Sequence, residues 1–218
     1  MLRKIRNLFL LVILAGFGFW IYRTHENVKN VMQYDDFVTQ TLEKHGVSGN
    51  RELVLSIIYT ETKGKRTDVM QSTESTHDTI ETEEDSIHQG ITNLTEMLEY
   101  AHEKGVDVWT GVQAYNFGKA YVDYIAKNGG KNTLTLAEGY SKDVVAPSLG
   151  NTTGEEYYHI TLDSLLFNKG KLYKNGGNIF YAKEVRWNMK IVHLWLYNKS
   201  CGKYIPMRFF CIKKSFPL

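Results

Sequence analysis

The chain has 218 residues, of which 43% are hydrophobic and 23% are charged, so it can bury the core of one globular domain with short appendages. Its formal net charge of +2 and the absence of a basic stripe in its central part argue against a nucleic-acid partner. Only three prolines occur, so long helices are rarely interrupted.

The first predicted element is a membrane helix at the N-terminus. Three basic residues precede an uninterrupted apolar run over 8–22, an arrangement that keeps the N-terminus in the cytoplasm. The run is short for a spanning helix, which needs about 17–25 residues, but flanking Arg6 and Arg23 can extend its reach by snorkelling. A cleaved signal peptide is the alternative, although no small-x-small cleavage site follows the run. In both interpretations everything after about Tyr22 lies outside the membrane.

The remainder of the chain carries mostly helical periodicity. Apolar residues at spacings of three and four predict helices over 27–44, 50–63, 87–105, 107–127, 134–145, 155–167 and 181–197. A polar, threonine-rich and acidic stretch over 66–85 is typical of a long functional or disordered loop. No sustained alternation of period two appears, so we expect an all-α or mainly α fold. The basic tail after 199 contains Cys201 and Cys211, which form either a disulfide or two free thiols.

One carboxylate lies on the apolar stripe of the second predicted helix. Val54, Ile57, Ile58 and Glu61 follow one another at helical spacings of three and four. Burial disfavours the charged form of a carboxyl group and raises its pKa, which suits a general acid that protonates a glycosidic oxygen. The alternative is that Glu61 lies at the edge of the stripe and points to water.

Three motifs follow Glu61 along the chain. They are Asp-Val-Met-Gln-Ser-Thr-Glu-Ser over 68–75, Ser-Ile-His-Gln-Gly-Ile over 86–91 and Gln-Ala-Tyr-Asn-Phe-Gly over 113–118. Together with Glu61 they resemble, in the correct order, the lysozyme-like domain of the CwlT family. That family occurs in Gram-positive bacteria, their conjugative elements and pneumococcal surface antigens, and belongs to the superfamily of soluble lytic transglycosylases and goose-type lysozymes. The resemblance covers about 31–196, including a late stretch over 173–182.

The resemblance implies roles for individual residues. Glu61 matches the catalytic acid, the pair Met70-Gln71 matches the loop that shapes the sugar cleft, and the pair Tyr115-Asn116 matches the aromatic-amide pair that faces the acid. Amide groups suit N-acetyl groups and ring hydroxyls, and the Tyr115 hydroxyl can hydrogen-bond Glu61. The predicted substrate-binding residues are Met70, Gln71, Ser72, Glu74, Gln89, Tyr115 and Asn116. We expect no metal ion and no cofactor.

The chain departs from the family pattern at several positions. Thr62 follows the acid where the family has serine, Thr73 replaces another serine, and the loop over 76–79 is more acidic than the pattern. We expect no cysteine endopeptidase domain of the kind that the bifunctional members carry, since 202–218 is too short to contain it. We therefore expect cleavage of the glycan and not of the stem peptide.

Two reaction outcomes are compatible with a single acid. Water attack on the anomeric carbon uses a second carboxylate, for which Asp68 and Glu74 are the candidates, whereas internal attack by the muramic acid 6-hydroxyl requires none. The sequence therefore leaves muramidase and lytic transglycosylase open.

The sequence predicts a glycan-cleaving enzyme that acts on peptidoglycan between N-acetylmuramic acid and N-acetylglucosamine, for local wall remodelling or conjugation. Its expected parts are a cytoplasmic stub and anchor over 1–24, a lysozyme-like domain over 25–198 and a tail over 199–218. It is expected to be a single-pass membrane protein with the domain facing the wall, and conjugation or secretion proteins are candidate partners. The competing interpretation is a wall-binding scaffold without catalytic activity.

Overall fold

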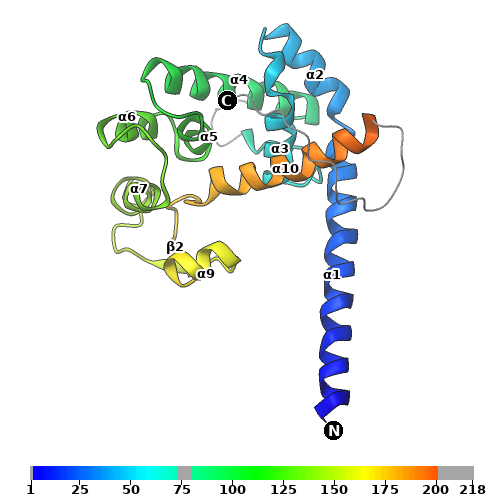
Figure 1. Cartoon of the computed structure of the whole chain (residues 1–218). Coiled ribbons are helices and arrows are strands. Elements are labelled where there is room, and N and C mark those ends of the chain that lie inside the picture. The colour runs from blue at the N-terminus through cyan, green and yellow to red at the C-terminus, as the bar shows by residue number, and fades with distance from the viewer. Residues whose placement is uncertain (1, 73–79, 201–218) are drawn as a thin grey trace.

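The computed structural model describes residues 2–72 and 80–200, and its longest element is the N-terminal helix α1 (Leu2–Met32). Figure 1 shows most of α1 standing clear of the other helices, with the N-terminus far from the domain. Among the described residues α1 is the helix that is long and apolar enough to cross a membrane, since an 18-residue window within it has a mean hydropathy of 1.8. Its C-terminal end is part of the domain, because Val28 and Val31 are buried in the core. The predicted membrane helix and the start of the domain are thus one continuous helix.

The mainly α-helical fold expected from the sequence is confirmed. After α1 the chain forms α2 (Asp35–Lys44), a 3₁₀ turn η1 (Ser48–Asn50), α3 (Arg51–Glu61), α4 (Glu83–Glu103), α5 (Val108–Phe117), α6 (Ala120–Lys127), α7 (Leu134–Tyr140), a π-helical turn η3 (Ser141–Val145), α8 (Ala146–Ser148), α9 (Leu162–Asn168) and α10 (Tyr181–Ser200). The tail with Cys201 and Cys211 lies outside the described residues.

Three predicted helices are wrong in detail. The helix expected over 27–44 is divided between the end of α1 at Met32 and α2, which begins at Asp35. The helix expected over 107–127 is broken into α5 and α6 at Gly118, whose φ of 85° is a left-handed conformation that favours glycine. The helix expected over 155–167 contains instead the strand β1 (Glu156–Tyr158), which pairs antiparallel with β2 (Lys171–Tyr173) on the far side of α9. Strands of three residues are too short to display the alternation by which a strand is recognised in a sequence.

The helix α3 lies at the centre of the larger core. Val54, Leu55, Ile57 and Ile58 are all inaccessible to solvent, and α10 packs along α3. A helix that is apolar on all sides is stable only when neighbouring helices surround it. A second apolar cluster under α5, α6 and α7 contains Tyr121 and Phe180. The end of α3 therefore lies well inside the domain, and Glu61 is its last residue.

Candidate active site

The backbone after Glu61 is held against the loop that follows. Glu61 is half-buried, and the next residue, Thr62, is buried. The Thr62 hydroxyl donates a 2.8 Å hydrogen bond to the Val69 carbonyl and accepts one of 3.2 Å from the Gly64 amide. Threonine keeps the hydroxyl group of the serine expected at this position. It connects the end of the acid-bearing helix to the Met70-Gln71 loop.

Asp68 organises the loop from within. Its Oδ1 accepts hydrogen bonds from the Ser72 amide (2.9 Å) and from the Ser86 hydroxyl at the start of α4 (2.6 Å). Between them Gln71 adopts a left-handed backbone with φ of 49°, which costs a non-glycine residue about 1–3 kcal/mol and is frequent at functional sites. Gln71 is half-buried, whereas its neighbour Met70 is buried, so Gln71 is the member of the pair that solvent can reach.

Two of the predicted substrate contacts are buried instead. Met70 and Ser72 have no solvent-accessible surface, so their side chains cannot touch a sugar in this structure. Met70 packs against α4 at Gly90, where an added Cβ would lie 2.6 Å from the Met70 sulfur. The Ser72 hydroxyl contacts Asp68 and the Ser86 carbonyl. These two side chains hold the loop in place, and this role replaces the direct contact that we expected.

Two tyrosines lie beside the acid, and only one of them was expected. The rings of Tyr115 and Tyr181 stack with centroids 6.2 Å apart and planes 12° apart. Burial raises the pKa of both phenols well above 10, and in each case the Glu61 carboxylate is the next contribution. Both phenols therefore stay protonated across the neutral pH range, close to the carboxylate of Glu61.

The hydroxyls of these tyrosines have different partners. The Tyr115 hydroxyl donates a 2.9 Å hydrogen bond to the Met70 carbonyl, not to Glu61 as we expected from the sequence. The buried Tyr181 hydroxyl has no partner of ordinary hydrogen-bond geometry among the described residues, but it interacts with the Glu61 carboxylate. Hydrogen bonds around a catalytic acid are often long without substrate and tighten in the complex. Tyr181 is the phenol suited to orient Glu61.

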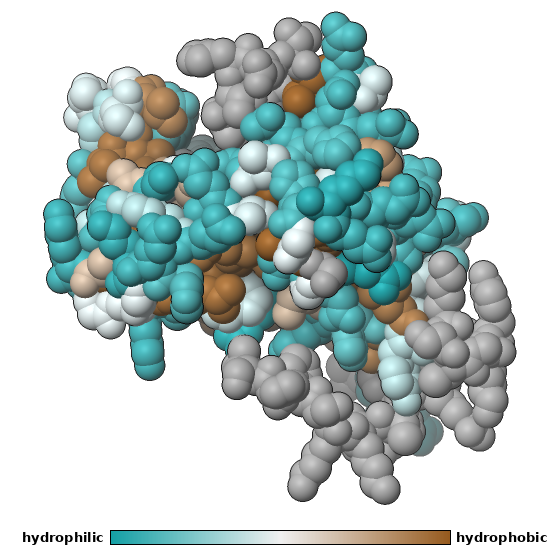
Figure 2. Space-filling model, turned by 90° about the horizontal axis from the view of Figure 1, so that it is seen from above, coloured by the Kyte–Doolittle hydropathy of each residue, from teal (hydrophilic) through white to brown (hydrophobic). Residues whose placement is uncertain are grey.

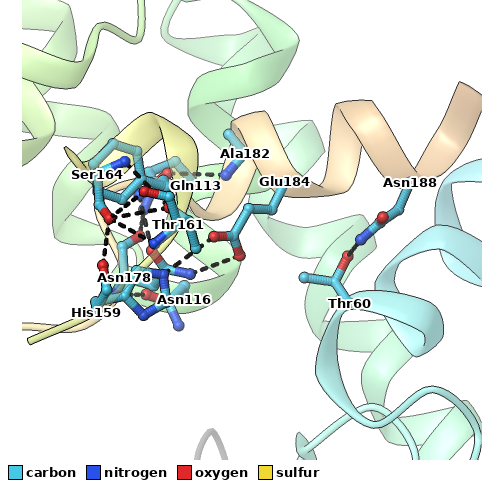
Figure 3. Close-up of polar contacts among 11 residues, drawn as sticks. Thr60, Gln113, Asn116, His159, Thr161, Ser164, Asn178, Ala182, Glu184 and Asn188 are labelled. Atoms are coloured by element: carbon cyan, nitrogen blue, oxygen red, sulfur yellow. Dashed lines mark hydrogen bonds and ion pairs between the residues drawn. The ribbon is translucent and has the colours of Figure 1, made fainter. Parts of the chain in front are cut away.

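The amides of the Gln-Ala-Tyr-Asn motif position Tyr181. Gln113 is fully buried, and its side chain donates to the Asn178 carbonyl (2.8 Å) and accepts from the Ala182 amide (3.1 Å). Asn116 Oδ1 accepts a 2.8 Å hydrogen bond from the Asn178 amide, as Figure 3 shows. The motif on α5 thus fixes the segment that leads into α10. Asn116 was expected to face the acid, and its carbonyl oxygen is used for this structural contact.

The first turn of α10 carries a second carboxylate, Glu184. Glu184 Oε2 accepts a 2.9 Å hydrogen bond from Asn178 Nδ2, and Glu184 Oε1 lies 3.4 Å from His159 Nε2 (Figure 3). Sequence reasoning missed Tyr181 and Glu184. The family-like stretch over 173–182 pointed to this part of the chain but did not distinguish among its residues.

A groove of about 260 Å³ lies beside the end of α3. Its lining comes from α3, the turn after it, α9 and α10, namely Tyr59, Thr60, Lys63, Asp163, Lys183, Glu184, Trp187 and Asn188. Asn188 Nδ2 donates a 2.9 Å hydrogen bond to the Thr60 hydroxyl across α3 and α10 (Figure 3). Hydroxyl, amide and carboxylate groups beside an exposed tryptophan suit a sugar ligand. Thr60 and Lys63 flank Glu61 in the chain.

The remaining predicted contacts are less well connected to this site. Gln89 is half-buried on α4, next to the Gly90 that packs against Met70. Glu74 lies outside the described residues. The structure thus brings together Glu61, Tyr115 and the Met70-Gln71 loop, and adds Tyr181 to them.

The family model described as Lysozyme-like matches residues 28–189, so the chain belongs to the lysozyme-like family. It is 49% identical to pneumococcal vaccine antigen A of Streptococcus pneumoniae over 205 residues, covering 93% of this chain and 100% of that protein. It is 32% identical to the bifunctional muramidase/DL-endopeptidase CwlT of Bacillus subtilis over 130 residues, covering 58% of this chain and 39% of CwlT. At the family level these relatives support cell-wall lytic activity, although the pneumococcal relative is named only as an antigen.

Two further comparisons bear on the fold and the membrane helix. A crystal structure of an NLP/P60-family lipoprotein from Staphylococcus aureus superposes with a TM-score of 0.67 at 28% identity, covering 74% of this chain and 52% of that chain. The uncharacterized membrane protein YocA of Bacillus subtilis is 39% identical over 121 residues, or 54% of each protein. The resemblance to the CwlT family is confirmed, and YocA together with α1 supports a single-pass membrane protein.

Proposed function

We propose that the protein cleaves the glycan strands of peptidoglycan, with Glu61 as the general acid that protonates the glycosidic oxygen between N-acetylmuramic acid and N-acetylglucosamine. The observation that carries this proposal is the half-buried Glu61 carboxylate at the end of a buried helix, interacting with two buried phenols. Partial desolvation favours the protonated form of a carboxyl group, as a general acid requires. The neutral phenols can then donate hydrogen bonds to the carboxylate that remains after the proton has passed to the leaving oxygen.

The groove at the end of α3, lined by Thr60 and Lys63 on either side of Glu61 in the chain, supports a sugar polymer as the ligand. Gln71 is the exposed member of the loop pair and Asn116 retains an amide nitrogen, so both can bind N-acetyl or hydroxyl groups. Asp68 accepts hydrogen bonds from Ser72 and Ser86 and acts mainly to fold the loop, which weakens its candidacy as a base. We therefore propose a mechanism that depends on one acid, with either water or the muramic acid 6-hydroxyl as the nucleophile.

The test is a comparison of two glutamate variants of the full chain in detergent. Glu61→Gln should abolish clearing of peptidoglycan in a zymogram, because glutamine cannot donate the proton, while circular dichroism shows a folded protein. Glu43→Gln, at an exposed position on α2, is the matched control and should clear as well as the wild type. Equal clearing by both variants would exclude Glu61 as the acid. Mass spectrometry of the products then separates anhydro ends, made by a transglycosylase, from reducing ends, made by a hydrolase.

A wall-binding scaffold is the second candidate function. It is favoured by the relatives that are named only as antigens. A scaffold has no need for a carboxylate among buried phenols. Support for it would require that the protein co-sediments with peptidoglycan and releases no muropeptides.

We also propose that the N-terminus of α1 lies in the cytoplasm and that the domain faces the wall, where conjugation or secretion proteins are candidate partners. The basic residues before the apolar run support this orientation. Protease added to intact protoplasts should remove the domain and leave the N-terminal stub protected.

A further inference from the structure

The segment between β1 and β2, here called the α9 lobe (residues 156–173), exposes an unusual amount of apolar surface. Leu162 and Leu166 of α9 are 75% and 78% exposed, and Leu165 is 49% exposed. Their spacings of three and four place them on one face of α9. Ile160 and Tyr158, just before α9, are also largely exposed. Contiguous apolar patches of this kind on a folded protein mark a surface that binds a partner or a membrane.

The leucines are presented by an ordered scaffold. The pairing of β1 with β2 closes the base of the lobe, and α9 begins with a capping box formed by Thr161 and Ser164. Asp163 accepts a 2.6 Å contact from Lys183 of α10, and the Phe167 ring meets Phe180 edge-on with centroids 6.0 Å apart. The lobe is therefore anchored to the domain on one side while its leucines point to solvent.

The position of the lobe relative to α1 indicates what covers the leucines. In Figure 1 the α9 lobe extends from the domain on the side from which α1 leaves it, level with the free part of α1 but separated from it. The burial of Val28 and Val31 fixes the direction of α1 with respect to the domain. The opposite face, which Figure 2 shows from above, is mostly hydrophilic. The apolar helix and the α9 lobe therefore extend from the same side of the domain.

We propose that the α9 lobe inserts its leucines into the membrane that α1 crosses, in the leaflet that faces the domain. Lys169, exposed at the end of α9, suits the anionic headgroups of that leaflet. The proposal rests on α1 serving as a retained membrane anchor, and it is independent of catalysis. The domain then lies on the bilayer with a fixed orientation, held by one spanning helix and one interfacial helix.

This arrangement has a consequence for the proposed site. Asp163 of α9 and Lys183 of α10 line the groove beside Glu61. If the lobe rests on the bilayer, the groove is held at a fixed and short distance from the membrane. The protein can then reach only the glycan strands that lie close to the membrane.

The experiment measures the depth of single labelled positions in vesicles. The full chain, with Cys201 and Cys211 replaced by serine, carries a fluorophore on Leu166→Cys and is reconstituted in phosphatidylglycerol and phosphatidylcholine vesicles with brominated acyl chains. The matched control carries the label on Glu99→Cys, an exposed position of α4. Figure 1 shows α4 at the end of the domain away from α9. We expect quenching to be several-fold stronger at 166 than at 99. We also expect a label on Leu165→Cys to lose its quenching in the Leu162→Asp/Leu166→Asp background.

Each outcome decides the proposal. Equal, weak quenching at both positions overturns it, and so does cross-linking between copies through position 166 without quenching by lipid. The same measurement on the Glu61→Gln variant should give unchanged quenching. Failure of the membrane contact is thus distinguishable from failure of the catalytic assignment.

Discussion

The Tyr115 hydroxyl donates a 2.9 Å hydrogen bond to the main-chain carbonyl of Met70, and so joins α5 to the loop that follows the acid-bearing helix. The Tyr115 ring stacks on Tyr181 at the start of α10. Tyr115 and Asn116, which the sequence motif places opposite Glu61, thus hold the neighbouring backbone in position. Tyr181, to which the sequence assigned no role, contributes the phenol that interacts with the carboxylate.

Tyr115→Phe should reduce stability more than it reduces the chemical step. The change leaves the Met70 carbonyl without its partner, at a cost of about 1–3 kcal/mol in the free energy of unfolding. For a domain of this size each kcal/mol lowers Tm by roughly 2–4 °C. Differential scanning calorimetry checks the shift. Tyr158→Phe, at a largely exposed position, is the control and should leave Tm unchanged.

Tyr181→Phe should reduce kcat with little change in KM. The lost hydroxyl interacts with Glu61, and a hydrogen bond to a charged group contributes about 1.5–3 kcal/mol, or roughly 10–100-fold in rate. Release of muropeptides over time from purified peptidoglycan measures the rate. A variant as active as the wild type would show that Tyr181 does not orient the acid.

Stability should fall steeply above pH 10. The pKa values of Tyr115 and Tyr181 are raised well above 10 by burial, so above pH 10 the unfolded state loses phenol protons that the folded state keeps. Each such group contributes stability that is complete below pH 10 and declines above it by up to about 1.4 kcal/mol per pH unit. Urea unfolding at pH 9 and pH 11 measures the loss. Tyr181→Phe should show a smaller loss, because one buried phenol is gone.

Gly90→Ala should destabilise the domain although alanine favours helix. An added Cβ would meet the Met70 sulfur at 2.6 Å, and overpacking costs about 1–3 kcal/mol, against a gain of about 1 kcal/mol in helix propensity. Gly49→Ala is the control, since nothing lies within 4 Å of a Cβ there. Chemical denaturation measures both variants. If overpacking is the cause, Met70→Val combined with Gly90→Ala should be less destabilising than the sum of the two changes.

The two substitutions of Asp68 should differ from one another. Asp68→Ala removes the acceptor of the Ser72 and Ser86 hydrogen bonds and should cost at least about 2 kcal/mol, whereas Asp68→Asn keeps an acceptor oxygen. If Asp68 only folds the loop, Asp68→Asn keeps most of the glycan-cleaving rate. Complete loss of activity in a stable Asp68→Asn variant would instead identify Asp68 as the base.

The helical class of the fold, the apolar N-terminal helix and the place of Glu61 on a largely apolar helix could be predicted from the sequence alone. Periodicity along one helix and an uninterrupted apolar run are patterns of neighbouring residues, and the order of the motifs can be read along the chain, so none of these features depends on tertiary contacts. The break at Gly118 and the short strands β1 and β2 escaped prediction, because single residues and three-residue strands carry too little pattern.

Which tyrosine hydroxyl lies near the acid could not be predicted from the sequence, because it depends on how distant segments pack. Tyr115 and Tyr181 are 66 positions apart in numbering and come from α5 and α10, and their partners depend on how Gln113 and Asn116 hold the segment before α10. The burial of Met70 and Ser72 likewise arises from packing between distant segments. Burial and hydrogen-bond partners depend on contacts throughout the fold, whereas the periodicity of a helix depends only on its own residues.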